Sequence, residues 1–583
     1  MAPACHHGRE GETLAEEQPG KGVKVMTKRA RRTFSFVPPP ELKTGEGAAP
    51  IVVVGAGPIG LSAALDLGLM GHRVIVLDKD NIVSDGSRAI CVAKRTLEIS
   101  DRLGIGDELL NKGVKWNIGR VFFRDEEITA FNLRPMAAQK FPAFVNIQQY
   151  YWEEYLIDRL AAVETVELRW LSKVTALEHK DDGVVLTVET PEGSYRLHAD
   201  WVIAADGAHS TMRRLMGLEF KGRIFEDNFL IADVRFKHEH PDERWFWFDP
   251  PFNPGKSALM HKQPDDVWRL DFQLGWDIDR EEAVKPENVT PFVRGMLGED
   301  VEFEYEWISI YTFQCRRLER FLHGRVIFAG DAAHLVSPFG ARGANSGVQD
   351  TDNLAWKLDL VIRGSAPASL LESYDFERTQ AADENILNST RSTEFITPKS
   401  PQSQAYRDAV LELSRHVEGI RPFINSGRLS VPRIYTDSPL STEDRPGEFQ
   451  AGLVPGSPAI DAPVKGRDSQ GWLLGQLGGR FQLLVFASSA AMARSMEQAL
   501  APLREGDPAL EPLFVLPPGM SADGVGSPVI VDAEGLVQER YAGRPGTVYL
   551  LRPDQHVAMR RRHLEPAEVA AALGKAAGRK DQA

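Results

Sequence analysis

Residues 325–357 read RVIFAGDAAHLVSPFGARGANSGVQDTDNLAWK. An apolar run at 326–329 predicts a buried strand that ends in Gly330 and Asp331. A Pro-Phe-Gly turn and a glycine-rich loop then lead into a helix that we expect to begin near Val348. Glycines let a ligand approach the backbone, and a helix amino end supplies oriented N–H groups and a positive dipole end. These residues therefore predict a site for a ligand with ribose hydroxyls and an electron-poor ring.

A similar pattern lies nearer the amino end, where residues 51–78 read IVVVGAGPIGLSAALDLGLMGHRVIVLD. An apolar strand is followed by three spaced glycines, a helix and a second strand that ends in Asp78. In this setting the glycine spacing is typical of dinucleotide binding. We expect Gly55 to make the turn, Gly57 to let a pyrophosphate reach the backbone, and Gly60 to let the helix pack on the strand. Asp78 would accept hydrogen bonds from the adenosine ribose.

Residues 200–213 repeat this order of buried strand, acidic turn and helix start, with Asp206 and Arg213 in the turn and the helix. Two polar residues between these patterns are further candidates. Arg88 enters an amphipathic helix, where it can reach a pyrophosphate, although a solvated surface arginine is an equal alternative. Gln149 precedes another helix, where its amide can bond a cofactor.

Short strand patterns separated by turn residues follow the second pattern. They predict an antiparallel sheet inserted into an α/β domain. Strand alternation puts His261 and Gln263 on one face, and likewise Arg269 with Asp271. The predicted strands are residues 228–236, 244–249, 257–263 and 267–274.

The last part of the chain differs from the rest in its residue pattern. Residues 353–398 predict two helices, and Pro and Gly residues beyond about residue 445 predict a linker. Strand and helix patterns then alternate as in an α/β domain. Cys5, Cys91 and Cys315 all precede this domain and form no CxxC pair, so thiol-disulfide chemistry is excluded there.

Composition narrows the class of partner. The chain of 583 residues has 43% hydrophobic and 26% charged residues and a net charge of −14. Nucleic acids and anionic membranes attract basic surfaces, so neither is an expected partner. No segment predicts a membrane span or a signal peptide, and we expect a cytoplasmic enzyme with a flexible arm at residues 1–48.

Taken in order, the motifs resemble those of the class A flavoprotein monooxygenases, the FAD-dependent aromatic hydroxylases typified by p-hydroxybenzoate and phenol hydroxylases. The similarity covers roughly residues 50–400 and is greatest to the 3-(3-hydroxyphenyl)propionate hydroxylase-like subgroup. It implies an α/β protein with a Rossmann-like FAD-binding domain, an inserted antiparallel β substrate domain and a C-terminal thioredoxin-like α/β domain. The bounds we expect are 49–224 and 311–400 for the FAD-binding domain, 225–310 for the substrate-covering sheet, 401–450 for a helical segment and linker, and 451–583 for the thioredoxin-like domain.

The resemblance also implies cofactor contacts in all three motifs. It puts Asp206, Ser210 and Arg213 against both FAD and the nicotinamide donor, and Asp331 on the ribityl-side ribose hydroxyls. The backbone of Gly343–Asn345 would lie against the flavin pyrimidine. The residues predicted to bind the cofactor are Gly55, Gly57, Pro58, Gly60, Asp78, Arg88, Gln149, Asp206, Gly207, Ser210, Arg213, Arg269, Gly330, Asp331, Gly340, Gly343, Ala344 and Asn345.

The implied reaction is hydroxylation of a phenolic compound with O2 and NADPH or NADH, through a C4a-hydroperoxyflavin and with no metal. Such a site needs a base for the phenol, worth ~10²–10⁴ in rate, and protection from water. His261 or Asp271 would take the phenolic proton, Tyr311 would donate to a substrate oxygen, and Pro338 would lie near the reacting edge. A packed histidine, an exposed carboxylate and a buried strand tyrosine are the structural alternatives.

Other outcomes on the same fold stay open at this point. They are Baeyer–Villiger oxygenation, halogenation, oxidase activity, and FAD binding without turnover. A single GxGxxG and the lack of a CxxxxC pair disfavour a disulfide reductase. The substrate, the choice between NADH and NADPH, and the oligomeric state are not decided by these motifs, and a homodimer is one alternative.

Overall fold

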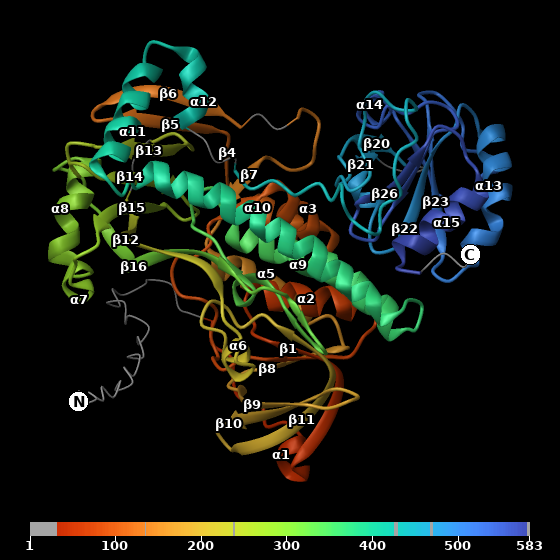
Figure 1. Cartoon of the computed structure of the whole chain (residues 1–583), viewed down its shortest axis with the longest axis horizontal. Helices are drawn as coiled ribbons and strands as arrows, with labels where there is room; N and C mark the ends of the chain where they lie inside the picture. The colour runs from red at the N-terminus through yellow and green to blue at the C-terminus, as the bar shows by residue number, and fades with distance from the viewer. Residues whose placement is uncertain (1–31, 134–135, 237–239, 425–428, 467–469, 580–583) are drawn as a thin grey trace, which may run out of the picture.

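The first sheet carries the three motifs at the ends of its strands. The computed structural model describes residues 32–133, 136–236, 240–424, 429–466 and 470–579. The strand order is β17-β18-β11-β1-β2-β8, with β10 and β9 added beside β11. Figure 1 shows β1, β8, β9, β10 and β11 in the lower part of the molecule. The strands are β1 (Glu46–Val54), β2 (Val74–Leu77), β8 (Val166–Arg169), β9 (Lys173–His179), β10 (Val184–Thr190), β11 (Gly193–Ala204), β17 (Leu322–His323) and β18 (Val326–Phe328).

Parallel pairing brings the motifs to one edge of this sheet. β11 pairs in parallel with both β1 and β18, so that Ala204 lies opposite Val54 on one side and Phe328 on the other. Because these residues end their strands, all three turns leave the sheet at the same edge. Helix α2 (Pro58–Leu69) packs on this sheet, and α5 (Gln149–Leu160) and α9 (Gly343–Ile362) pack against α2.

Helix α9 begins at Gly343, five residues before the expected start near Val348. Glycine disfavours helices, which is why the sequence pointed to a later start. Tertiary contacts override this preference, because Gly347 is packed against Gly330 and Ile59. Helix α10 (Glu372–Ile396) lies beside α9 across the middle of the molecule (Figure 1). It falls within residues 353–398, which were predicted to form two helices, whereas α9 begins ahead of that region.

The second sheet has the order β19-β16-β12-β15-β14-β13-β5-β6. Alternation along its strands creates two apolar faces. Trp268, Leu270 and Phe272 belong to one cluster, which contains residues of helix α8, and Phe246 and Phe248 belong to the other. The elements are β5 (Ile118–Phe123), β6 (Glu126–Asn132), β12 (Lys221–Arg235), β13 (Arg244–Phe248), β14 (Ser257–Lys262), β15 (Val267–Gly275), β16 (Glu304–Arg317), β19 (His334–Leu335), α7 (Arg280–Ala283) and α8 (Pro286–Leu297).

The membership of this sheet differs from the expected segment 225–310. Strands β5 and β6 come from residues assigned to the FAD-binding domain, and β5 pairs in parallel with β13. Strands β12 and β16 each run across an expected boundary, at residues 224 and 310. Neither feature shows in the local pattern, because strand pairing over a long sequence distance leaves no local signal.

The C-terminal part forms a separate α/β layer in the order β21-β20-β24-β23-β22-β25-β26, shown in blue in Figure 1. β22, β23 and β24 are parallel, and antiparallel strands flank them, with β25 and β26 on one side and β20 and β21 on the other. The predicted fold class is confirmed. The elements are β20 (Pro463–Lys465), β21 (Gln470–Trp472), β22 (Phe481–Phe486), β23 (Leu510–Leu516), β24 (Val529–Val531), β25 (Val548–Leu551), β26 (Val557–Arg561), α13 (Ala490–Arg504), α14 (Leu536–Arg540) and α15 (Pro566–Ala576).

Residues 32–48, which we expected to belong to a flexible arm, are packed against the first sheet. Phe34 stacks on Trp170 with ring centroids 4.3 Å apart. Glu41, in helix α1 (Glu41–Thr44), is buried and lies 3.2 Å from the guanidinium of Arg169. Aromatic stacking and this ion pair attach the segment to the core, whereas residues 1–31 lie outside the described residues.

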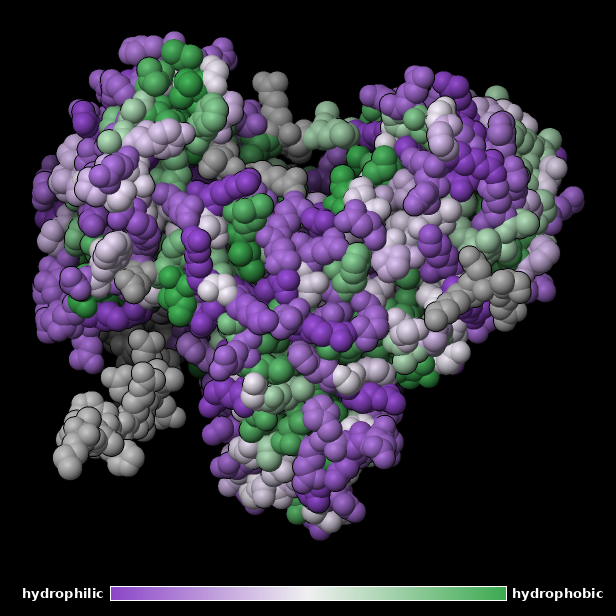
Figure 2. All heavy atoms as spheres, in the orientation of Figure 1, coloured by the Kyte–Doolittle hydropathy of each residue, from purple (hydrophilic) through white to green (hydrophobic). Residues whose placement is uncertain are grey.

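Smaller elements complete the chain around the two sheets. Figure 2 shows apolar residues gathered over α11 and α12, where Leu413, Val417 and Phe423 are exposed. In the described ranges, no helix combines the length and the apolar character needed to cross a membrane. The elements are β3 (Cys91–Ala93), β4 (Val114–Trp116), β7 (Phe144–Asn146), α3 (Lys94–Arg102), α4 (Gly106–Lys112), α11 (Pro401–Ser414) and α12 (Arg421–Ile424).

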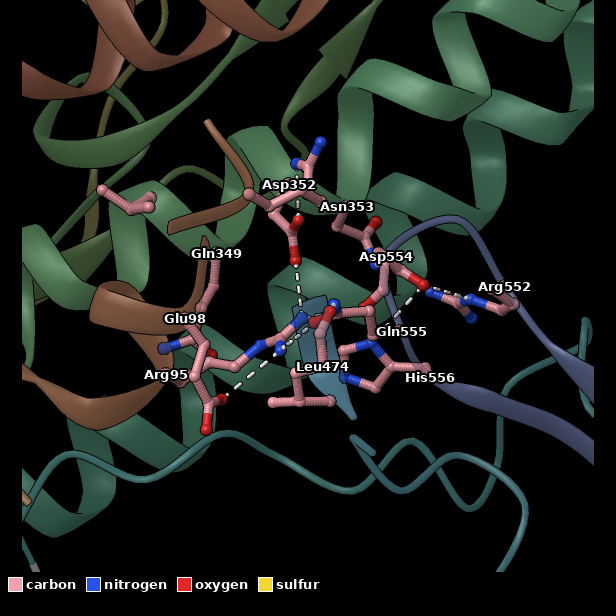
Figure 3. Close-up of polar contacts among 12 residues, drawn as sticks. Arg95, Glu98, Gln349, Asp352, Asn353, Leu474, Arg552, Asp554, Gln555 and His556 are labelled. Atoms are coloured by element: carbon pink, nitrogen blue, oxygen red, sulfur yellow. Dashed lines mark hydrogen bonds and ion pairs between the residues drawn. The ribbon is translucent and has the colours of Figure 1, made fainter. Parts of the chain in front are cut away.

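Buried charges join the C-terminal domain to α9 and its neighbours. Arg95 of α3 donates to Asp352 of α9 at 3.0 Å and to Gln555 of the C-terminal domain at 2.8 Å (Figure 3). Glu377 of α10 accepts from Lys357 of α9 at 2.8 Å and from Arg552 of the C-terminal domain at 2.6 Å. All these side chains are almost completely shielded from solvent. Buried ion pairs and hydrogen bonds therefore hold the C-terminal domain against α3, α9 and α10.

We predict that Glu377→Gln destabilises the protein strongly. The substitution leaves Lys357 and Arg552 as buried cations without this carboxylate, at a cost of about 3–5 kcal/mol. Thermal and urea unfolding measure the loss. Glu178→Gln is the matched control, because Glu178 lies on the surface beside Lys180 at 2.9 Å, and it should leave the melting temperature unchanged. Equal effects of the two substitutions would contradict the role given to the buried network.

Candidate active site

The three motifs touch one another at the edge of the first sheet. Gly55 has φ +108°, and a Cβ there would lie 2.4 Å from the carbonyl oxygen of Ala205. A Cβ on Gly347 would lie 2.7 Å from Ile59 of α2 and 3.0 Å from the Cα of Gly330. Glycine is therefore required where the first motif meets the second and where the third motif meets α2.

The other glycines of the first motif have different surroundings. A Cβ on Gly60 would lie 1.9 Å from the carbonyl oxygen of Gly55, so α2 packs on its strand only with glycine there. A Cβ on Gly57 would meet no atom within 4 Å, which leaves open space in front of the backbone. Pro58 occupies the first turn of α2, where its fixed φ suits a helix start. This cradle fits the pyrophosphate of a dinucleotide.

Acidic residues at the ends of two strands are bonded to the backbone of the turns. Asp78 accepts hydrogen bonds from the N–H of Ala56 at 2.5 Å and from that of Asp80. Asp206 accepts from the Ser210 hydroxyl at 2.6 Å and from a backbone N–H of α6 (Thr211–Leu215). Burial raises the pKa of both carboxyls. Both acids hold their turns in shape, and contacts with a ribose or a nicotinamide stay predictions.

Arg213 links the second motif to the third. Its guanidinium donates to the carbonyl of Ala208 at 2.7 Å and to that of Ala332 at 3.4 Å, and it lies 3.9 Å from the ring centroid of Phe220. Gly207 has φ +80° and open space at its Cβ position. The turn therefore presents bare backbone beside a fixed cation.

Asp331 and the amino end of α9 form the centre of the cleft. The Asp331 carboxylate accepts no hydrogen bond from any described residue, and a Cβ on Gly343 would lie 3.9 Å from its Oδ1. The N–H groups of Gly343, Ala344 and Asn345 are in the first turn of α9, where no carbonyl of the helix can accept them. An acceptor-only carboxylate beside free donors fits a flavin with its ribose-type hydroxyls and pyrimidine oxygens.

Two residues predicted to bind the cofactor, Gln149 through its amide and Asn345 through its backbone, use their side chains on neighbouring segments. The Asn345 side chain accepts from the N–H of Ala93 and donates to the carbonyl of Cys91, both at 2.8 Å. The Gln149 side chain accepts from the N–H of Ala89 at 3.1 Å. These amides fasten neighbouring segments to the cleft wall, which leaves the backbone of Asn345 to face the ligand.

Asp350 is a residue that the sequence reasoning missed. It accepts from the N–H of Gly330 at 2.9 Å and is bonded to His334 at 2.7 Å and to Arg378 at 2.6 Å. Although burial opposes its charge, His334 and Arg378 hold the pKa of Asp350 below its usual range. The turn that presents Asp331 is thus anchored from behind. The feature of the sequence that could have pointed to Asp350 is an acidic residue inside a helix that is otherwise buried.

The second sheet contributes a row of charged and polar side chains. His261 pairs with Arg269 on the neighbouring strand, and Arg269 donates to both oxygens of Asp271 and to the carbonyl of Ser87. Both oxygens of Asp271 are thus engaged by the Arg269 guanidinium, which leaves this carboxylate less available to a phenol. Burial, with the charges of Arg244 and Arg269, holds the pKa of His261 well below 6.5. His261 is therefore a neutral imidazole, and its Nδ1 has no hydrogen-bond partner among the described residues.

The remaining predicted residues border open space. Tyr311 is 43% exposed and lies 5.5 Å from Phe313 between ring centroids, so the alternative of a buried strand tyrosine is wrong. Pro338 and Arg88 are exposed as well. Gly340 has φ +102° and follows Phe339 in the loop before α9.

An aromatic pocket adjoins this loop. It lies between the second sheet, the loop before α9, and helices α10 and α12, and its empty space, with the open solvent at its mouth included, is about 630 Å³. Apolar rings of this kind accept a planar aromatic molecule and keep water away from it. Its phenylalanines are Phe131, Phe246, Phe248, Phe339 and Phe395.

Comparison with known proteins identifies the family. Residues 48–389 match the family model described as FAD binding domain. The 12-dehydrotetracycline 5-monooxygenase/anhydrotetracycline 6-monooxygenase of Streptomyces rimosus is 31% identical over 423 residues, 68% of this chain and 81% of the relative. The chain belongs to this family of FAD-dependent monooxygenases. A second relative of this monooxygenase, the 3-(3-hydroxy-phenyl)propionate/3-hydroxycinnamic acid hydroxylase of Mycolicibacterium gilvum, is 30% identical over 524 residues, 87% of this chain and 88% of the relative.

Solved structures share the fold of this monooxygenase. The flavin-dependent monooxygenase PieE, in complex with FAD and substrate, aligns with a TM-score of 0.77 at 21% identity, over 92% of this chain and all of PieE. The OxyS anhydrotetracycline hydroxylase from Streptomyces rimosus aligns with a TM-score of 0.65 at 26% identity, over 91% of this chain and 99% of OxyS. The C-terminal domain is included in both alignments.

We predict that alanine at two glycines of the first motif separates flavin binding from folding. In Gly57→Ala the added methyl enters open space, so the melting temperature of the FAD-free protein stays the same while FAD affinity falls. In Gly60→Ala the methyl overlaps a backbone oxygen, so stability itself falls. Flavin retention and thermal unfolding distinguish the two. Normal FAD affinity in Gly57→Ala would contradict the pyrophosphate assignment.

Proposed function

We propose that this monooxygenase hydroxylates a phenolic aromatic compound, with O2 and NADPH or NADH as co-substrates. The observation that carries the proposal is the meeting of three glycine and aspartate turns at one sheet edge beside an aromatic pocket. The relative from Mycolicibacterium gilvum is named as a hydroxylase of 3-(3-hydroxy-phenyl)propionate, a compound with a ring hydroxyl, which supports the same class of substrate here. Bound FAD would supply the redox chemistry, because it can take electrons from NADPH or NADH and pass them to O2.

In this proposal the FAD site is built from the cleft residues. The open backbone at Gly57 takes the pyrophosphate, Asp331 accepts from ribityl-side hydroxyls, and the first turn of α9 donates to the flavin pyrimidine. Arg88 is exposed at the same cleft, where it can neutralise phosphate. The free donors of α9 and the carboxylate of Asp331 complement the polar edge of such a cofactor.

The pocket would hold the ring of the substrate. Phe246, Phe248 and Phe339 would pack against it and exclude water, so that O2 activated at bound FAD would be used on the substrate rather than lost as hydrogen peroxide. Neutral His261 would accept the phenolic hydrogen bond, and Tyr311 would donate to a substrate oxygen. With a pKa so far below its usual range, His261 makes the phenol more nucleophilic mainly by this hydrogen bond rather than by full proton transfer.

The cytoplasmic location predicted from the sequence belongs to this proposal as well, and a homodimer is the alternative to a monomer. Light scattering of the purified protein measures its mass directly, and a mass near twice that of the chain would support the homodimer. A mass equal to that of one chain would contradict the homodimer and would not affect the proposed reaction.

We predict that the purified protein contains FAD and that phenols stimulate its NAD(P)H consumption. With labelled oxygen gas, the product gains one labelled oxygen, which excludes a simple oxidase, and absence of halogen and of ring expansion excludes the other outcomes. Asp331→Ala should weaken FAD binding by on the order of tenfold or more, because it removes a charged hydrogen-bond acceptor. If no phenol stimulates NAD(P)H consumption, the proposed substrate class is wrong. Unchanged flavin occupancy in Asp331→Ala would contradict the role of Asp331 at the ribose-type hydroxyls.

A further inference from the structure

One cation in the aromatic pocket has no counter-charge bonded to it. Arg244 lines the pocket beside Phe246 and Phe248, and within the described residues its guanidinium makes no hydrogen bond or ion pair. Arg120 lines the same pocket, but its guanidinium is bonded to the carboxylate of Glu243. Arg244 is thus the arginine of this pocket that is left to meet a ligand.

The surroundings of Arg244 do not offer an internal partner. The titratable groups close enough to affect it are Cys91, Asp271 and Arg269, and His261 lies opposite it in the next strand. Asp271 is already held by both guanidinium branches of Arg269. Burial lowers the pKa of Arg244, because a cation away from water is costly until an anion approaches it.

We propose that Arg244 binds a carboxylate of the substrate and so selects aromatic acids over neutral phenols. The inference rests on the proposed function, because it names the class of substrate that the same pocket takes. A guanidinium presents paired N–H donors that match the two oxygens of a carboxylate. The phenylalanine rings around it would cover the aromatic part of the molecule and strengthen the ion pair by excluding water.

The sheet register sets where the acid group lies. Arg244 pairs with His261, and His261 pairs with Arg269, so Arg244 and Arg269 are two strands apart. Two strand spacings amount to about 10 Å. Arg269 is fastened to the carbonyls of Ser87 and Arg88, on the side of the cleft assigned to the flavin. The carboxylate would therefore lie at the end of the substrate remote from the reacting carbon, with His261 between the two ends.

The experiment is calorimetric titration of the FAD-containing enzyme with pairs of aromatic acids and their uncharged amides. The probes are 3-hydroxybenzoate and 3-(3-hydroxyphenyl)propionate, each with its amide. The wild-type enzyme should bind at least one acid on the order of ten- to a hundredfold more tightly than its amide. Arg244→Met should bring that ratio close to one, mainly by weakening the acid, and Arg244→Lys should restore part of it.

Arg124→Met is the matched control. Arg124 carries the same charge and lies at the end of β5, but it is exposed and outside the pocket, 3.4 Å from Asp249. This variant should keep the wild-type preference for acids. An equal preference in wild type and Arg244→Met, or no acid that binds better than its amide, would overturn the inference.

Binding and turnover separate this inference from the proposed function. If acids bind through Arg244 but no phenol stimulates NAD(P)H consumption, the inference holds and the proposed reaction fails. If phenols are hydroxylated while acids and amides bind alike, the reaction holds and the inference fails.

Discussion

The charges buried behind α9 are the constraint on which the cleft depends. Asp350 fastens the turn that presents Asp331, while Asp352 and Lys357 of α9 join ion pairs that reach α3, α10 and the C-terminal domain. The amino end of α9 faces the cleft because the rest of the helix cannot shift without separating charges away from water. Helix α9 leaves its first N–H groups free for a ligand, and the buried ion pairs along its later turns hold it in place.

The C-terminal domain acquires a role from this arrangement. Its loop around Arg552 and Gln555 supplies partners for Glu377 and Arg95, so it completes the polar layer on the far side of α9. No cysteine lies in this domain, and a structural role suits a thioredoxin-like fold that lacks thiol chemistry. The aromatic pocket, on the opposite side of the cleft, is built from the second sheet and owes little to this domain.

Much of the cleft could be predicted from the sequence because its glycine turns are local features. Strand, glycine spacing and helix follow one another within about thirty residues in such units, as they do at Gly55–Asp78. Long-range packing could not be predicted in the same way. The sequence did not show that the side chains of Asn345 and Gln149 are hydrogen-bonded to neighbouring backbone groups. It also did not show that Asp350 anchors the turn at Gly330, or that β5 extends the second sheet. Each of these contacts joins residues whose spacing along the chain carries no periodic signal.

The central claim is that the amino end of α9 binds the flavin. Hydrogen exchange of the backbone amides of Gly343, Ala344 and Asn345, compared between the FAD-free and FAD-loaded protein, tests it most directly. The account predicts slower exchange of these amides when FAD is bound, with little change in the exposed turns of α13. Equal exchange rates at the three amides in both forms would contradict it.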